Sequence, residues 1–166
     1  DDSGLLQIGP TSAEAWPGPA CYGRGGERAT VTDANVALGY FSDTDLLGGA
    51  MAITGDLARN AIRDTIGGPL GVEGLEAAYA IYTLVNENMA NAVRQISTEQ
   101  GHDLRDFAFV CGGGCSAAHA ARIAESLGVS RIIVPRVASL LCSFGAVITD
   151  VRHDYSRNHA AHFGQC

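Results

Sequence analysis

The clearest alternation of apolar and polar positions lies between residues 75 and 99. Apolar side chains recur there at steps of three or four residues, at Leu75, Ala78, Tyr82, Val85, Met89, Val93 and Ile96. This period places them on one face of a helix about seven turns long. Gly101 follows, at the usual position of a residue that ends a helix. The pattern predicts a long helix over 75–99 whose apolar stripe is core or, as we favour, a subunit interface.

Shorter patterns stand on both sides of this helix. A helix is predicted over 56–66, where Gly67-Gly68-Pro69 stops it. After the long helix the apolar runs alternate, and they predict strands at 107–111 and 131–134 and helices at 116–127 and 139–151. The order strand, helix, strand implies a parallel pair with a right-handed crossover, and hence an α/β sheet.

The first 31 residues have neither a helical nor a strand period. Glycine and proline dominate 16–26, and the large Trp16 and Tyr22 favour a loop fixed on an apolar surface over a mobile linker. A short strand is then predicted over 28–32. Thr32 or Asp33 is expected to cap a helix that runs to about Leu38.

Composition limits the class of protein. The chain has 166 residues, 46% of them hydrophobic and 17% charged, which fits one globular domain rather than two. Its net charge of −7, with no basic cluster, argues against binding to nucleic acid or to an anionic membrane. The longest apolar stretch, 137–148, is shorter than the roughly 20 residues of a membrane span. Five cysteines at irregular spacing do not form a disulfide framework, so we expect a cytoplasmic protein.

A triple glycine, Gly112-Gly113-Gly114, stands between a predicted strand and a predicted helix. Residues without a Cβ allow a sharp turn and a close approach of the backbone to a ligand. The following helix would aim its first N–H groups and the positive end of its dipole at the same place. Nucleotide contact and a tight structural turn are both compatible with this pattern, which is not the Gly-x-Gly-x-x-Gly dinucleotide fingerprint.

Other residues near this turn give weaker indications of a catalytic or metal site. Ser116 and His119 lie one helical turn apart, but no third orienting residue accompanies them, so nucleophilic catalysis is not favoured. Cys111 and Cys115 flank the glycines, and small buried thiols explain them better than a metal site does.

The C-terminal end contains a candidate zinc (Zn) site. His159, His162 and Cys166 would share one face of a helix, and imidazole and thiolate both suit zinc. The alternative is a solvated chain end.

Several of these segments occur together in one known family. The segments 8–26 and 29–35, followed by Leu38-Gly39, resemble the hydantoinase A and 5-oxoprolinase family, which includes acetone and acetophenone carboxylase subunits. The resemblance extends over nearly the whole chain, through 86–94, the glycines at 112–114, Val134-Pro135 and 141–155.

The resemblance implies the α/β fold of the C-terminal portion of an actin-like domain, the fold of sugar kinases, actin and chaperone ATPases. Residues 1–166 would then be a single partial domain, with a loop region at 1–35, a helical region at 56–100 and an α/β region at 107–151. The two phosphate loops of such a domain lie upstream and match no part of this chain. All eleven basic residues are arginines, so a Walker-type lysine must also come from elsewhere.

The implied activity is ATP-dependent. Members use ATP and Mg²⁺ to activate a carbonyl group of a cyclic amide or ketone by phosphoryl transfer, a step dominated by positioning and charge. Here Gly112, Gly113 and Gly114 would contact adenosine. The implied partners are an upstream hydantoinase A-like polypeptide that carries the phosphate loops and a hydantoinase B-like subunit, in a hetero-oligomer.

The loop at 9–35 is expected to line the phosphate end of the site, with Cys21, Tyr22, Thr32 and Asp33 as candidates. A Gly/Pro-rich loop can present N–H groups to an anion, whereas Asp33 can equally be only a helix cap. The family's glycine turn usually continues with Gly-Pro-Leu-His-Ala, and this chain has Ser116-Ala-Ala-His-Ala120. A second hypothesis is therefore a non-catalytic assembly subunit with a degenerate nucleotide site.

Overall fold

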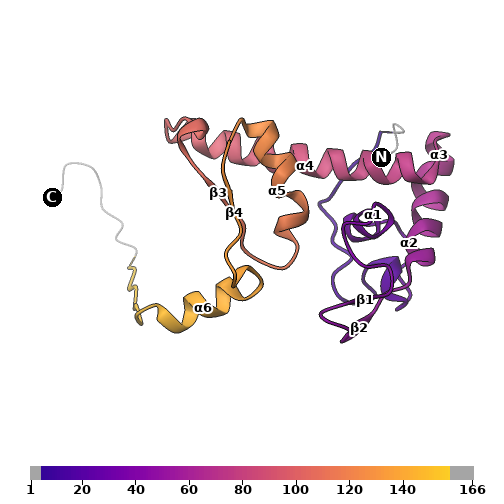
Figure 1. Cartoon of the computed structure of the whole chain (residues 1–166), viewed down its shortest axis with the longest axis horizontal. Coiled ribbons are helices and arrows are strands. Elements are labelled where there is room, and N and C mark those ends of the chain that lie inside the picture. Colours follow the sequence, from indigo (N-terminus) through magenta and orange to yellow (C-terminus); the bar gives the residue numbers. More distant parts are fainter. Residues whose placement is uncertain (1–4, 158–166) are drawn as a thin grey trace.

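The long helix α4, Gly74–Glu99, is the frame of the molecule. A computed structural model describes residues 5–157. The N-terminal segments pack under one end of α4, and the segments after it turn back under the other end (Figure 1). No helix among the described residues has the length and apolar character needed to cross a bilayer.

The N-terminal half is mostly loop and short helix. A 3-10 turn at Ala20–Tyr22 precedes α1 at Val31–Ala37. An antiparallel pair follows, formed by β1 at Asp45–Leu46 and β2 at Met51–Ala52. Helix α2 spans Gly55–Ile62, widens to a π-helical turn at Arg63–Gly67 and continues into α3 at Gly68–Leu70. The peptide bonds before Pro10 and Pro17 are cis.

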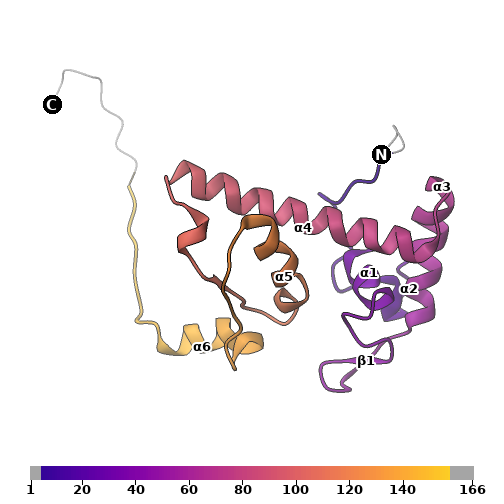
Figure 2. The same ribbon diagram turned by 45° about the horizontal axis from the view of Figure 1, so that its top comes forward.

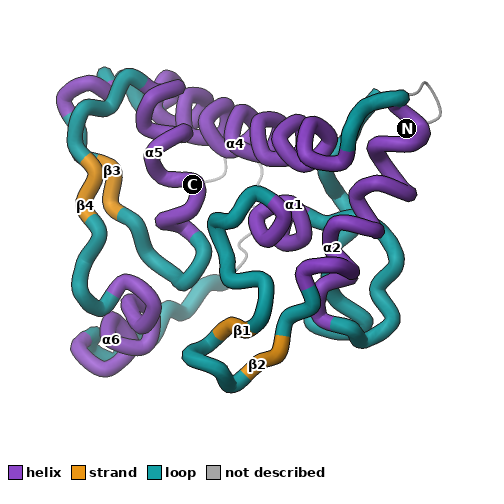
Figure 3. Tube along the Cα trace, turned by 45° about the vertical axis from the view of Figure 1, so that its right-hand side comes forward, coloured by secondary structure: helices purple, strands orange, loops and turns teal. Residues whose placement is uncertain are grey.

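The C-terminal half contains the predicted strand-helix-strand unit. Strand β3 at Phe109–Val110 pairs in parallel with β4 at Ile132–Ile133, and α5 at Ser116–Leu127 connects them. The register sets Phe109 opposite Ile132 and Val110 opposite Ile133. Two 3-10 turns, Leu104–Asp106 and Ala138–Leu140, precede β3 and α6, and α6 spans Leu141–Ile148. The two strand pairs are separate two-stranded sheets, drawn as orange stretches of the tube in Figure 3.

Two buried clusters hold these segments on α4. Alanines of α1 and α4 let the helices approach closely around Ile62 of α2, in a cluster of Ala34, Ile62, Ala77, Ala78 and Ile81. The second cluster joins α4 to α5 and the residues after it, through Ala90, Ile123, Ala124, Leu127 and Val129. The predicted stripe on α4 is thus core in its middle, whereas Leu75 and Ile96 at its ends are exposed.

Two predictions for the N-terminal region are wrong. Residues 28–32 do not form a strand, because Thr30 caps a helix that already begins at Val31. The Thr30 hydroxyl accepts the Asp33 N–H, and the Asp33 carboxylate accepts the Thr30 N–H. Trp16 does not fix the loop on an apolar surface, since it is 73% exposed. The loop is held instead by the close approach of two of its own backbone segments, at Gly18 and Gly26. They are so near that a Cβ on Gly26 would lie 2.1 Å from the Gly18 carbonyl oxygen.

The last predicted helix also ends earlier than expected. It was predicted over 139–151, and α6 stops at Ile148. Figures 1 and 2 show α6 standing apart from α1, α2 and α4. Its apolar side chains Phe144, Val147 and Ile148 are exposed in the described part of the chain.

Candidate functional site

The glycine turn between β3 and α5 faces open space. Gly113 has φ of 96°, a left-handed conformation that glycine adopts readily, and its N–H donates to the Ala138 carbonyl at 2.7 Å. A Cβ built on Gly113 or Gly114 would meet no described atom within 4 Å. Gly112 is different, because a Cβ there would lie 2.9 Å from Cδ2 of Leu141. The second and third glycines thus leave room for a further atom, although Gly113 itself is only half-exposed.

The N-terminus of α5 opens at the same turn. Cys115 occupies the N-cap position and makes no side-chain hydrogen bond to the helix. The Ser116 hydroxyl donates back to the Gly113 carbonyl at 3.3 Å. Of the first N–H groups of this helix, that of Ala118 donates to the Cys115 carbonyl at 3.2 Å, and no described side chain caps the others, which can donate to a ligand.

His119 is a buried histidine in the first turns of α5. Its Nδ1 lies 3.1 Å from Oδ1 of Asn86, and its Nε2 lies 3.1 Å from Nδ2 of Asn35. Burial lowers the pKa of the ring, so it is neutral at pH 7. Since both nitrogens have amide partners and the Ser116 hydroxyl bonds to Gly113, the structure forms no Ser116–His119 nucleophilic pair.

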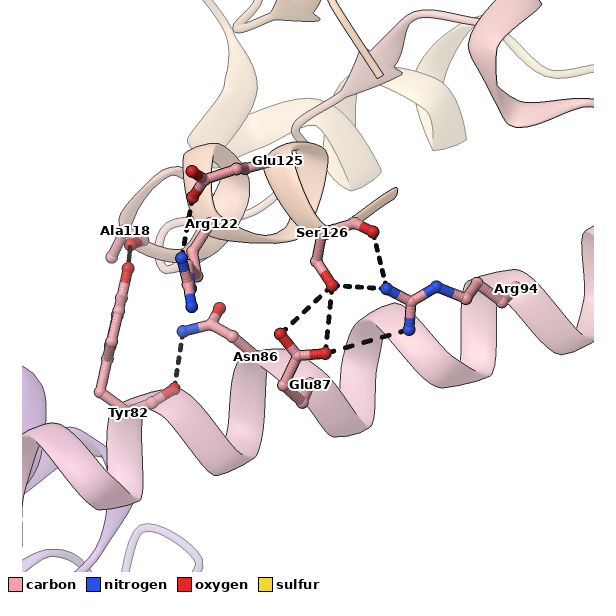
Figure 4. Close-up of polar contacts among 8 residues, drawn as sticks. All are labelled: Tyr82, Asn86, Glu87, Arg94, Ala118, Arg122, Glu125 and Ser126. Carbon is pink, nitrogen blue, oxygen red and sulfur yellow. Dashed lines mark hydrogen bonds and ion pairs between the residues drawn. The ribbon is translucent and has the colours of Figure 1, made fainter. Parts of the chain in front are cut away.

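Helix α5 is fastened to α4 near both of its ends (Figure 4). Near the glycine turn, the Tyr82 hydroxyl donates to the Ala118 carbonyl at 3.0 Å. Burial, with a smaller contribution from Tyr40, raises the pKa of Tyr82 to about 12, so this hydroxyl keeps its proton. At the far end, Arg94 donates to the carbonyl and hydroxyl of Ser126, and that hydroxyl donates to Glu87.

The carboxylate of Asp33 is fully buried and organises the N-terminal loop. It accepts the Cys21 N–H at 2.8 Å and the Ala20 N–H at 3.3 Å, in addition to the N–H and hydroxyl of Thr30. The capping role considered for Asp33 is therefore present. The same carboxylate also fixes the backbone of the loop twelve residues earlier.

The other three candidates of the loop lie in different surroundings. Burial, and then the charge of Asp33, raises the pKa of Cys21 to about 12, so Cys21 remains a thiol. Burial raises the pKa of Tyr22, and the charges of Cys21 and Cys115 add to the rise. Thr32 lies elsewhere, in the wall of a cavity of about 500 Å³ between the N-terminal segment and α1.

This cavity is separate from the glycine turn. Its walls combine apolar side chains of Ile8, Val31, Ile66 and Ile81 with polar groups that include Arg28. The structure thus pairs Cys21 with Asp33 beneath the loop and sets Thr32 in the wall of this cavity.

The cysteine and metal predictions have a mixed outcome. Cys111 is buried as expected, whereas Cys115 is exposed and so is not a packing thiol. Within residues 5–157 no group of three His, Cys, Asp or Glu side chains is placed to hold a metal ion. His159, His162 and Cys166 lie outside the described residues.

Sequence reasoning missed Asn35 and Asn86, which partner His119. Both are almost fully buried, at 2% and 1% exposed. The available signal was a polar residue on an apolar helix face, as Asn86 lies one turn after Tyr82 on the buried side of α4.

Replacing Asp33 tests its role as an anchor. Asp33→Ala would leave two loop N–H groups and the helix cap without an acceptor, and we expect a loss of about 2–4 kcal/mol of unfolding free energy. Asp56→Ala is the control, because this acidic residue of α2 is exposed and makes only a surface ion pair with Arg59. Urea unfolding of the intact protein measures both, and equal small losses would contradict the assignment.

Comparison with known proteins agrees with this architecture. Residues 1–155 match the hydantoinase/oxoprolinase family. The caprolactamase subunit alpha of Pseudomonas jessenii is 49% identical over 93% of this chain and 22% of its own length. The acetophenone carboxylase gamma subunit of Aromatoleum aromaticum is 38% identical over 95% of this chain and 21% of its own.

A solved structure extends the comparison to the fold. The crystal structure of the ATP-dependent caprolactamase from Pseudomonas jessenii has a TM-score of 0.82 to this chain, covering 92% of it and 22% of that protein. The chain therefore spans about a fifth of the length of these relatives. On the family match and these similarities, the chain belongs to the hydantoinase/oxoprolinase family.

Proposed function

We propose that this chain is the C-terminal part of a subunit that uses ATP to activate a carbonyl substrate, with Gly112, Gly113 and Gly114 against the adenosine end of the nucleotide. One observation carries the proposal, namely the open turn at the uncapped N-terminus of α5. A turn with a purely structural role would be expected to pack under neighbouring side chains, whereas a Cβ on Gly113 or Gly114 would meet no described atom within 4 Å. Residues 1–166 would form a single partial domain of actin-like fold, and the parallel β3–β4 pair with its α5 crossover supports that fold.

The N-terminal loop would serve the phosphate end of the site. Tyr22 would take part from its place next to Cys21, whose N–H Asp33 holds. Thr32 and Arg28 line the cavity of about 500 Å³ and offer a hydroxyl and a cation to an anionic or carbonyl group. Cys21 and Asp33 would act from below, by holding the loop in place.

The relatives favour a cyclic amide over a ketone as the substrate. Identity to the caprolactamase subunit is 49%, against 38% to the acetophenone carboxylase subunit. ATP dependence is named for the caprolactamase structure, and we extend it to this chain. Mg²⁺ in nucleotide sites is held largely by phosphate oxygens, and we assign this ion to the polypeptide that carries the phosphate loops. A zinc ion at His159, His162 and Cys166 stays a separate proposal.

An exposed apolar surface supports a partner for this chain. We use the name α6 face for the exposed apolar side chains of β4, of α6 and of the segments that adjoin them, namely Ile132, Ile133, Val134, Val137, Leu140, Phe144, Val147, Ile148 and Val151. Parallel strands are normally covered on both faces, whereas β4 is exposed here. We infer that the upstream hydantoinase A-like part covers this face and that a hydantoinase B-like subunit completes a hetero-oligomer. The free cysteines at 21, 111, 115 and 142 fit a cytoplasmic assembly.

The second candidate function is a non-catalytic assembly subunit. Two observations favour it: the α6 face is suited to docking, and Ser116 and Ala117 replace the residues usual after the family's glycine turn. In that case the turn would stay open without binding a nucleotide.

Gly114 separates the two functions. A Cβ is tolerated there by the described chain, so Gly114→Asp should fold and should block the turn by bulk and negative charge. We expect at least a roughly tenfold weaker ATP affinity in isothermal titration of the intact subunit, with Gly114→Ala affected less. Unchanged affinity in Gly114→Asp would favour the assembly role.

A charge introduced into the α6 face tests whether a partner covers that face. Val147 and Leu47 are similarly exposed in this chain, at 84% and 80%, but only Val147 lies on the α6 face. If the face is covered, Val147→Glu should lower the thermal midpoint of the intact assembly by several degrees, and Leu47→Glu should not. Equal midpoints for the two variants would show that the α6 face is free.

A further inference from the structure

A row of buried polar groups joins three helices directly behind the glycine turn. Asn86 of α4 donates through Nδ2 to the Tyr82 carbonyl at 2.7 Å, and its Oδ1 contacts Nδ1 of His119 on α5. On the other side of the ring, Nε2 contacts Nδ2 of Asn35 on α1. All three side chains are at least nine-tenths buried.

The chemistry of the groups fixes the direction of every bond in this row. The Tyr82 carbonyl can only accept, so the NH2 group of Asn86 faces it and Oδ1 of Asn86 faces His119. Nδ1 of His119 must then carry the proton, which leaves Nε2 to accept from the NH2 group of Asn35. At the end of the row, Oδ1 of Asn35 is buried and has no partner among the described residues.

The row holds the first turns of α5 in a fixed orientation. His119 follows Gly114 by five residues, and its neighbour Ala118 accepts the Tyr82 hydroxyl (Figure 4). The Tyr82 ring also stacks on the His119 ring, with centroids 5.4 Å apart and planes inclined by 22°. The start of α5 is thus hydrogen-bonded to two residues of α4, Tyr82 and Asn86, and to one residue of α1, Asn35.

The composition of the row points to a geometric purpose. Three apolar side chains would fill the same space without an unpaired Oδ1 on Asn35, which costs free energy when it is buried. Directed hydrogen bonds fix the rotation and height of a helix more narrowly than apolar contacts do. A buried polar row that lowers stability but fixes the orientation of α5 is expected where the position of the glycine turn is important for binding.

We propose that Asn35, Asn86 and His119 are positioning residues that set the glycine turn for the nucleotide. The inference rests on the proposed function, because the turn would be the adenosine contact. The row acts through the backbone of α5 and touches no ligand itself. Its effect on binding should therefore exceed its effect on stability.

Asn35→Leu removes the unpaired oxygen together with the donor to His119, so the gain from the first partly offsets the cost of leaving Nε2 of His119 without a donor. His119→Phe is the second variant, because it keeps the ring stacked on Tyr82 and removes both hydrogen bonds. Ser126→Ala is the matched control, since it cuts the Glu87 and Arg94 contacts at the far end of α5. For Asn35→Leu and His119→Phe we expect a roughly tenfold higher dissociation constant and KM for ATP at nearly unchanged kcat, and no such change in Ser126→Ala.

Amide hydrogen exchange of residues 112–118 in the full protein gives a second readout that needs no nucleotide. The proposal predicts faster exchange there in Asn35→Leu and His119→Phe than in Ser126→Ala. If the two variants exchange faster but the unmodified protein binds no ATP, the proposed function is contradicted. The positioning of the turn by the three residues is then still supported. Unchanged exchange, or equal acceleration in Ser126→Ala, would overturn the positioning role.

Discussion

Two buried polar side chains of the short helix α1 determine how the two halves of the molecule meet. Asp33 and Asn35 are two residues apart, so they point to nearly opposite sides of the helix. Asp33 binds the backbone of the N-terminal loop, and Asn35 binds the ring of His119 in α5. Helix α1 therefore lies between the loop and the start of α5, and both segments take their position from it.

The remainder of the architecture follows from α4. Its small buried residues, Ala77, Ala78 and Ala90, let α1 and α5 pack closely against different stretches of the same helix. Polar contacts near both ends of α5 then fix its rotation on α4. These contacts leave the glycine turn uncovered and leave the α6 face without a neighbour. The turn is thus held from behind by α4 and left open on its other side, as the proposed ligand site would require.

The elements that depend on short-range sequence pattern were predicted from that pattern. The period of α4 and the order of β3, α5 and β4 were predicted, because apolar spacing and glycines determine them. The start of α1 was missed, since the β-branched run at 30–32 resembles a strand and the Thr30–Asp33 capping box decides otherwise. Trp16 was placed wrongly, because an aromatic side chain does not reveal whether this chain covers it.

The candidate site was predicted in part for the same reason. The glycines and the loop residues stand out in the sequence, but whether they are open or buried depends on packing. Asn35, Asn86 and His119 could not be grouped in advance, because Asn35 and His119 are 84 positions apart and Asn86 and His119 are 33 apart. No periodicity links residues across such separations.

Photolabelling with an azido-adenosine derivative of ATP tests the nucleotide assignment most directly. The chain has no lysine, so trypsin releases the glycine turn and the start of α5 as one peptide, residues 106–122. In the intact protein we expect the label on that peptide, with competition by unmodified ATP. Label confined to other peptides, and competed by ATP in the same way, would contradict the claim that this turn holds adenosine.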